Sequence, residues 1–187
     1  MGIVSEFMLD RNDAVLVVID VQEKLCQAMD EKILAALTKR ISILQTAAQE
    51  LQIPQLVTEQ YVKGLGATIA GLKEGLSTPA IEKMTFSCCG EPAFPEALQK
   101  HGRKQIIVTG METHVCVLQT VLQLLEAGYI VHVVADAVMS RKKENWQIGL
   151  AMAQQAGAVI TSTETALFQL LRVAGSEEFK KISKLVR

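Results

Sequence analysis

The chain has 187 residues, of which 49% are hydrophobic, and its formal net charge is −1. This length and hydrophobicity suit one globular domain with a sizeable core and exclude a disordered chain. The near-neutral charge disfavours nucleic-acid binding as the main function. A membrane span is excluded because charged or amide residues interrupt each apolar run.

The start of the chain differs in character from the rest. Met1–Phe7 precedes a second methionine and matches no structural pattern. We therefore predict a leader of cloning origin, followed by a single domain over residues 8–187 with no targeting peptide at its start.

The cysteines indicate the redox compartment. The chain has four of them, and they form neither a CxxC pair nor the Cys/His spacing of a zinc site. Without a secretion signal, they predict reduced thiols in the cytoplasm or, less simply, in an organelle. The adjacent pair Cys88 and Cys89 is interpreted as structural.

The first half of the domain alternates between predicted strands and helices. Ala14–Asp20 is continuously apolar up to its final acid, which is typical of a central parallel strand buried on both faces. Glu31–Leu51 has apolar residues at helical spacing, and Gln55–Thr58 follows as a short strand. The glycine-rich stretch Glu59–Ser77 predicts a long loop of the functional kind.

The second half is organised around one strand-to-helix junction. Ile106–Thr109 predicts a short buried strand that Gly110 ends, and a helix begins at about Val115 and closes at Gly128. The other predicted elements are strands at Ala80–Met84, Ile130–Ala135 (followed by Asp136) and Ala158–Thr161, and helices at Phe94–His101, Lys143–Ala156, Thr163–Leu171 and Ser176–Leu185. This alternation predicts an α/β fold, a three-layer α/β/α sandwich around a six-stranded parallel sheet.

Three ionisable residues stand at the carboxyl ends of predicted strands. Asp20 ends the first strand, Lys83 lies at the end of the third, and Cys116 opens the helix after the fourth. Parallel strands end at one edge of a sheet, so the three side chains are expected to converge there. A cation and a helix N-terminus both favour the thiolate, which predicts a lowered pKa for Cys116. Taken singly, each residue also fits a plain role: a turn aspartate, a solvated lysine or an inert buried cysteine.

At these residues the sequence resembles the isochorismatase-like cysteine hydrolases, which include nicotinamidases and N-carbamoyl amino-acid amidases. The matching motifs are VVIDVQ at Val17–Gln22, the lysine of IEKMTFS at Ile81–Ser87, and TGMETHVCV at Thr109–Val117. They occur in the family's order and spacing, and the likeness spans Ala14–Leu171. TEQYVKGLG at Thr58–Gly66 is most similar to the branch described as isochorismatase domain-containing proteins.

The resemblance implies a mechanism and assigns roles. Asp20, Lys83 and Cys116 would form the catalytic triad, and a non-proline cis peptide would join Met111 to Glu112. The backbone N–H groups of Glu112 and Cys116 would bind the oxyanion. Cys116 would then cleave the C–N bond of a small-molecule amide or carbamoyl substrate through a thioester. A homo-oligomer, dimeric or higher, is also implied.

One departure from the family pattern concerns metal. Nicotinamidases have a metal-binding Asp-x-His after the second strand, whereas this chain has Glu59, Gln60 and Tyr61 there. The three histidines, His101, His114 and His132, lie on different predicted elements. We therefore predict no metal and no cofactor. The candidates for lining the substrate pocket are Gln22, Tyr61, Phe86 and Thr113.

Two other classes of function stay open. The chain could be a catalytically idle relative whose surfaces Leu118–Leu125 and Ala151–Gln155 pack between subunits or against a partner. A nucleic-acid role would use the basic runs Arg141–Lys143 and Lys180–Lys184, although such runs are more often solvated faces.

Overall fold

The computed structural model describes residues 2–74 and 78–186. Its centre is a six-stranded, all-parallel sheet with the strand order β3-β2-β1-β4-β5-β6. The strands are β1 (Ala14–Ile19), β2 (Gln55–Gln60), β3 (Ile81–Lys83), β4 (Gln105–Met111), β5 (Ile130–Met139) and β6 (Val159–Thr161). The predicted fold class is confirmed.

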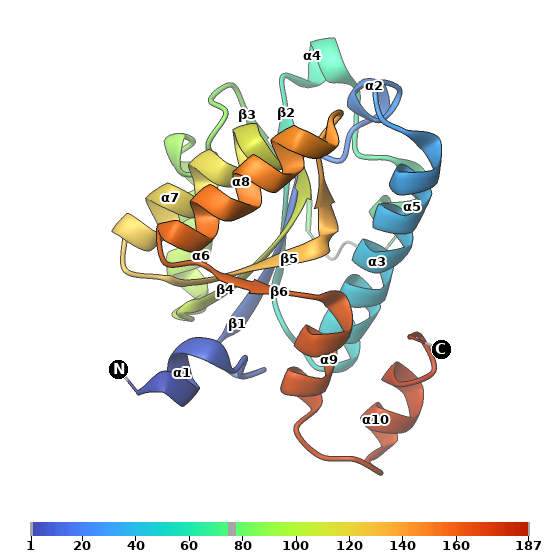
Figure 1. Ribbon diagram of the computed structural model, residues 1–187, viewed down its shortest axis with the longest axis vertical. Coiled ribbons are helices and arrows are strands. Elements are labelled where there is room, and N and C mark those ends of the chain that lie inside the picture. Colours follow the sequence, from blue (N-terminus) through green and yellow to red (C-terminus); the bar gives the residue numbers. More distant parts are fainter. Residues whose placement is uncertain (1, 75–77, 187) are drawn as a thin grey trace.

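Helices cover both faces of the sheet (Figure 1). They are α1 (Ile3–Phe7), α2 (Glu23–Cys26), α3 (Glu31–Glu50), α4 (Val62–Leu65), α5 (Ala70–Lys73), α6 (Ala93–His101), α7 (Leu118–Glu126), α8 (Lys143–Gln155), α9 (Thr163–Leu171) and α10 (Glu177–Ile182). A 3₁₀ turn spans Cys88–Gly90 and a π-helical turn spans Thr113–Val117.

The core has two halves, one on each face of the sheet. Along β1, Leu16 and Val18 pack in the half that contains α3 and α9, whereas Val15 and Val17 pack in the half that contains α6 and α7. This alternation explains why the whole of β1 is apolar: successive side chains point to opposite faces, and both faces are covered. Figure 1 shows α3, α9 and α10 on one side and α6, α7 and α8 on the other.

Side-chain caps set where several helices begin. Asp30 accepts hydrogen bonds from the backbone N–H groups of Lys32 and Ile33 at 3.0 and 3.1 Å and so starts α3. Ser162 and Ser176 cap α9 and α10 in the same way. The helix predicted at Ser176–Leu185 is therefore present as α10, and it begins directly after Ser176.

Several predicted boundaries are wrong. β5 continues through Asp136 to Met139, and β2 extends to Gln60, because each strand keeps a parallel neighbour beyond the residue where apolarity ends. The predicted loop Glu59–Ser77 contains α4 and α5, and its last residues, 75–77, lie outside the described part of the chain. Ile3–Phe7 of the predicted leader forms a helical turn.

The prediction that Gly110 ends its strand is wrong. Gly110 lies inside β4, at a φ of 110° that favours glycine. A Cβ atom at this position would overlap the backbone of Ile19 on the neighbouring strand β1. The absence of a side chain therefore lets β1 and β4 approach just below the sheet edge where the site lies.

We expect Gly110→Ala to lower the free energy of unfolding by about 3 kcal/mol, because it combines a disfavoured φ with overpacking. Gly102→Ala is the matched control: that glycine also has a positive φ, of 62°, but a Cβ there would meet no atom within 4 Å. Urea denaturation of both variants measures the difference. Equal losses would show that contact with Ile19 is unimportant.

Candidate active site

The candidate site lies at the carboxyl edge of the sheet, where the strand order changes direction between β1 and β4. Asp20 follows β1 directly, with a φ of 53°, and Cys116 lies in the π-helical turn shortly after β4. Lys83 is the last residue of β3. Such a switch point between parallel strands is where open α/β sheets form their ligand sites.

Lys83 and Asp20 form a buried ion pair. The Lys83 Nζ lies 2.6 Å from the Asp20 Oδ2, and both side chains are fully buried. The same ammonium also donates to the Gln60 Oε1 at 2.7 Å and to the backbone carbonyls of Thr85 and Phe86 at 3.2 and 3.0 Å. A buried cation with this many acceptors is held in one place, and the adjacent Asp20 carboxylate compensates its charge.

The other oxygen of Asp20 is also bound. The Thr58 hydroxyl donates to the Asp20 Oδ1 at 2.7 Å, and the Cys88 Sγ lies 3.6 Å from the Thr58 Oγ1. Neither Thr58 nor Cys88 was a predicted site residue. The sequence contained only a weak signal for them: Thr58 ends the predicted second strand, and Cys88 follows Lys83 by five positions.

The charges of both members of the ion pair act on the pKa of the Cys116 thiol, and Asp20 also acts on it as a hydrogen-bond partner. Burial raises the pKa of the Cys116 thiol well above its ordinary value, and the Asp20 charge raises it further, whereas Lys83 only lowers it in part. The predicted lowering of this pKa is therefore wrong, because the sequence argument weighed nearby charges and left out the loss of solvent around the sulfur.

The location of Cys116 also differs from its prediction. It was expected in the first turn of a helix that begins at about Val115, but α7 begins at Leu118 and Cys116 lies in the preceding π-helical turn. The Thr120 hydroxyl donates to the Cys116 carbonyl at 2.7 Å and accepts the backbone N–H of Cys88 at 2.9 Å. Thr120 thus ties the π-helical turn that contains Cys116 to the segment that follows Lys83.

The π-helical turn that contains Cys116 has further bonds on its other side. The peptide bond between Met111 and Glu112 is cis, as the resemblance implied. The Glu112 carboxylate accepts the backbone N–H of Arg141 at 2.9 Å and pairs with its guanidinium at 3.1 Å. His114 bonds Ser140 at 3.0 Å through Nδ1 and Asn145 at 3.2 Å through Nε2.

The predicted pocket residues have different surroundings. Gln22 is fully buried: its amide donates to the carbonyls of Gln60 and Gly66, and its Oε1 accepts the Gln60 N–H. These bonds secure the end of β2, and the role of Gln22 as a pocket residue stays a prediction. Thr113 is buried too, and its hydroxyl has no hydrogen-bond partner within the described residues.

The two aromatic candidates are half exposed beside Lys83. Tyr61 lines a cavity of about 330 Å³ together with Lys83 and Met84. The Phe86 side chain is 55% exposed and does not line that cavity, although its carbonyl accepts from Lys83. Tyr61 is thus the aromatic candidate that the structure brings to a hollow next to the ion pair.

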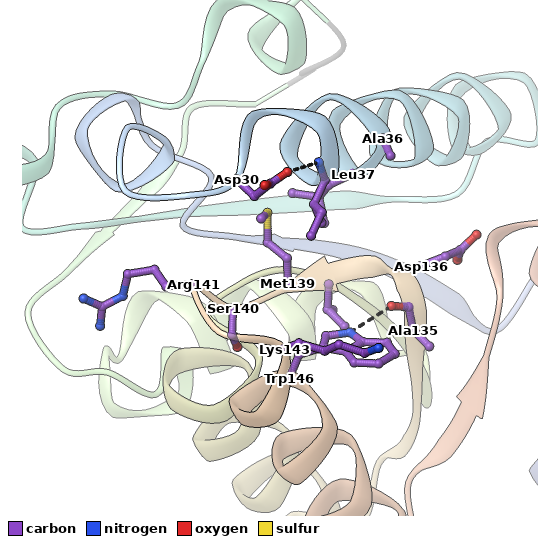
Figure 2. Close-up of a pocket in the computed structure, with 12 residues that line it drawn as sticks. Asp30, Ala36, Leu37, Ala135, Asp136, Met139, Ser140, Arg141, Lys143 and Trp146 are labelled. Atoms are coloured by element: carbon purple, nitrogen blue, oxygen red, sulfur yellow. Dashed lines mark hydrogen bonds between the residues drawn. The ribbon is translucent and has the colours of Figure 1, made fainter.

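A larger cavity, of about 410 Å³, opens between the start of α3, the end of β5 and the start of α8. Figure 2 shows Met139 directed toward α3, with Trp146 below β5 and hydrogen-bonded to the Ala135 carbonyl. The triad residues do not line this cavity. Two of its lining residues bond the segment around Cys116: Ser140 bonds His114, and Arg141 bonds Glu112.

The structure also bears on metal binding, on membrane spans and on the state of the cysteines. Within residues 2–74 and 78–186, no three His, Cys, Asp or Glu side chains gather closely enough to hold a metal ion. None of the helices described is both long and apolar enough to cross a membrane. Each of the four cysteines is free.

Comparison with known proteins places the chain in a family. The family model described as "Isochorismatase domain" matches residues 14–165. An isochorismatase domain-containing protein 2 from Xenopus laevis is 35% identical over 182 residues, covering 95% of this chain and 85% of the relative. The chain therefore belongs to the isochorismatase family of hydrolases.

Two further comparisons extend this result. A protein of Phytophthora sojae named secreted isochorismatase effector Isc1 is 43% identical over 152 residues, covering 76% of this chain and 70% of the relative. A solved structure described as MAR1 ribonuclease from Caenorhabditis elegans has a TM-score of 0.89 and 39% identity, and the match covers 96% of this chain and 92% of that one. These names describe the relatives, and they differ in the activity and compartment they suggest.

Proposed function

We propose that this protein is a cysteine hydrolase that cleaves the C–N bond of a small amide or carbamoyl compound through a thioester on Cys116. The observation that carries the proposal is the Asp20–Lys83 ion pair, buried beside the Cys116 thiol. Such a pair supplies a fixed proton acceptor next to a nucleophile that must lose its proton. Isochorismatase chemistry on a vinyl ether needs no cysteine, so Cys116 favours C–N cleavage.

The proposed reaction has two halves. The Cys116 thiol gives its proton to Asp20 as the sulfur attacks the carbonyl carbon, and the backbone N–H groups of Glu112 and Cys116 bind the oxyanion. Asp20 then protonates the amine as the C–N bond breaks. In the second half a water gives a proton to Asp20 while its oxygen attacks the thioester carbon. The C–S bond breaks, and the proton on Asp20 returns to the sulfur.

The raised pKa of the thiol is consistent with this scheme. A protonated thiol at rest keeps a second negative charge away from Asp20 and makes proton transfer part of the attack. Lys83 holds the Asp20 carboxylate in place and has no direct contact with the reacting atoms in this scheme. No metal or cofactor takes part in any step, and the substrate is a small molecule.

The test is intact-mass measurement after incubation with panels of small amides, ureas and carbamoyl compounds. We expect a mass increase equal to one acyl or carbamoyl group, located at Cys116 by peptide mapping. Cys116→Ala abolishes the adduct, whereas Cys89→Ala, which removes a half-buried thiol outside the triad, keeps it. An adduct that persists in Cys116→Ala would overturn the proposal.

Ribonuclease activity competes as a second candidate because a similar Caenorhabditis elegans structure carries that description. The arrangement of charge opposes it here. Arg141 pairs with Glu112, Lys180 with Glu177 and Lys181 with Glu50, so much of the cationic charge in the two basic runs is neutralised. Cleavage of RNA by the parent protein that falls steeply with salt and is lost on substitution of these cations would favour the ribonuclease instead.

Two further parts of the proposal concern assembly and location. We propose a homo-oligomer, since a solved YcaC structure from Escherichia coli with 23% identity and a TM-score of 0.87 is described as octameric. The competing view is an idle relative that keeps only such subunit contacts, which the adduct experiment separates from the enzyme. For the location we propose the cytoplasm, where free thiols persist.

A further inference from the structure

One chain of hydrogen bonds next to the triad has no role in the reaction as written above. It begins at the π-helical turn that contains Cys116, where the Thr120 hydroxyl bonds both the Cys116 carbonyl and the Cys88 N–H. It continues from the Cys88 Sγ to the Thr58 Oγ1 at 3.6 Å and from Thr58 to the Asp20 Oδ1 at 2.7 Å. Thr58, Cys88 and Asp20 are all fully buried, so solvent does not compete for these bonds.

The direction of each hydrogen bond follows from counting protons. An ionised carboxylate can only accept, so the single hydroxyl proton of Thr58 must lie toward Asp20. The Thr58 oxygen is then left as an acceptor, and Cys88 must donate its S–H. Burial raises the pKa of the Cys88 thiol to about 12, so it keeps this proton at neutral pH.

The result is a carboxylate held at both oxygens. Lys83 fixes the Oδ2 and Thr58 fixes the Oδ1, so the plane of the Asp20 carboxylate cannot rotate freely. A carboxylate has about four acceptor positions, and these two bonds leave others free to take a proton. The orientation of the remaining positions toward sulfur or water is therefore set by Thr58 as well as by Lys83.

We propose that Thr58 and Cys88 are positioning residues that orient the Asp20 carboxylate for proton transfer, with the largest effect on hydrolysis of the thioester. This inference rests on the function proposed above. Hydrolysis of the thioester is the more sensitive step because the attacking water has no covalent link to the protein. Its attack therefore depends on a correctly oriented base, which is Asp20. Cys88 acts one bond further away and has the smaller effect.

The probe is p-nitrophenyl acetate, whose nitrophenolate leaves without needing a proton. Its initial burst reports acetylation of Cys116, and its steady-state rate reports hydrolysis of the thioester. Thr58→Val keeps the shape of the side chain but removes the hydroxyl. We expect a burst of unchanged amplitude and a steady-state rate lowered about tenfold, as for loss of one hydrogen bond to a charged group.

Conservative variants separate positioning from mere structural support. Thr58→Ser retains the hydroxyl and is expected to recover the steady-state rate to within about threefold of the parent. Cys88→Ala is expected to slow hydrolysis about threefold, and Cys88→Ser, which still donates, to restore it. This second pair decides the matter if Thr58→Val fails to fold. Cys116→Ala supplies the background rate.

The outcomes are distinguishable. If the parent forms no acetyl-Cys116, the proposed function fails and takes this inference with it. If the parent is acetylated but Thr58→Val and Cys88→Ala hydrolyse the thioester at the parental rate, the inference alone fails. The inference is also overturned if each serine variant loses as much steady-state rate as its partner, Thr58→Val or Cys88→Ala, while the burst and the melting temperature fall as well. That result would show a purely structural role.

Discussion

Replacing Lys83 with methionine is expected to lower the free energy of unfolding by about 3–5 kcal/mol. The Asp20 carboxylate would stay fully buried with its partner cation gone, and a charge without compensation in that position is costly. The Gln60 Oε1 and two backbone carbonyls would lose a donor as well. Urea denaturation at neutral pH measures the loss.

Two further variants test whether the loss comes from the buried ion pair. The double variant Asp20→Asn with Lys83→Met removes both charges, so we expect it to recover much of the stability lost by Lys83→Met alone. Lys180→Met breaks an exposed pair with Glu177 and should change stability far less, because water screens that pair. If Lys83→Met proved no more destabilising than Lys180→Met, the buried pair would not be a structural centre of the fold.

The pH midpoint of Cys116 alkylation is expected to be higher than that of an ordinary thiol. Burial and the Asp20 charge both raise the pKa of Cys116, so little thiolate is present at neutral pH. Asp20→Asn removes the negative charge and should move the labelling midpoint to lower pH. Lys83→Met removes the positive charge and should move it higher, and each unit of movement changes the thiolate fraction about tenfold.

Iodoacetamide labelling followed by peptide mass spectrometry measures these midpoints one cysteine at a time. Cys89 serves as the internal control because burial raises its pKa without a contribution from Asp20 or Lys83. Its midpoint should stay the same in all three proteins. If Lys83→Met left the pH midpoint of Cys116 labelling unchanged, Lys83 would not be the electrostatic partner of this thiol.

The pattern of the sequence by itself determined the fold and the meeting of three residues. The apolar run of β1 predicted burial on both faces, and alternation of strands with helices predicted a parallel sheet, because both follow from local periodicity. Asp20, Lys83 and Cys116 could be brought to one sheet edge for the same reason: parallel strands all end on the same side.

Only the tertiary structure decided how those residues behave. The sign of the Cys116 pKa shift depends on burial, which is a property of the packed molecule and not of neighbouring sequence. The partners of Asp20 depend on side-chain directions across three strands, so Thr58 was missed, as were the bonds by which Gln22 holds backbone groups of Gln60 and Gly66. Local pattern specifies where a strand ends, whereas hydrogen-bond geometry and loss of solvent arise only when distant segments pack together.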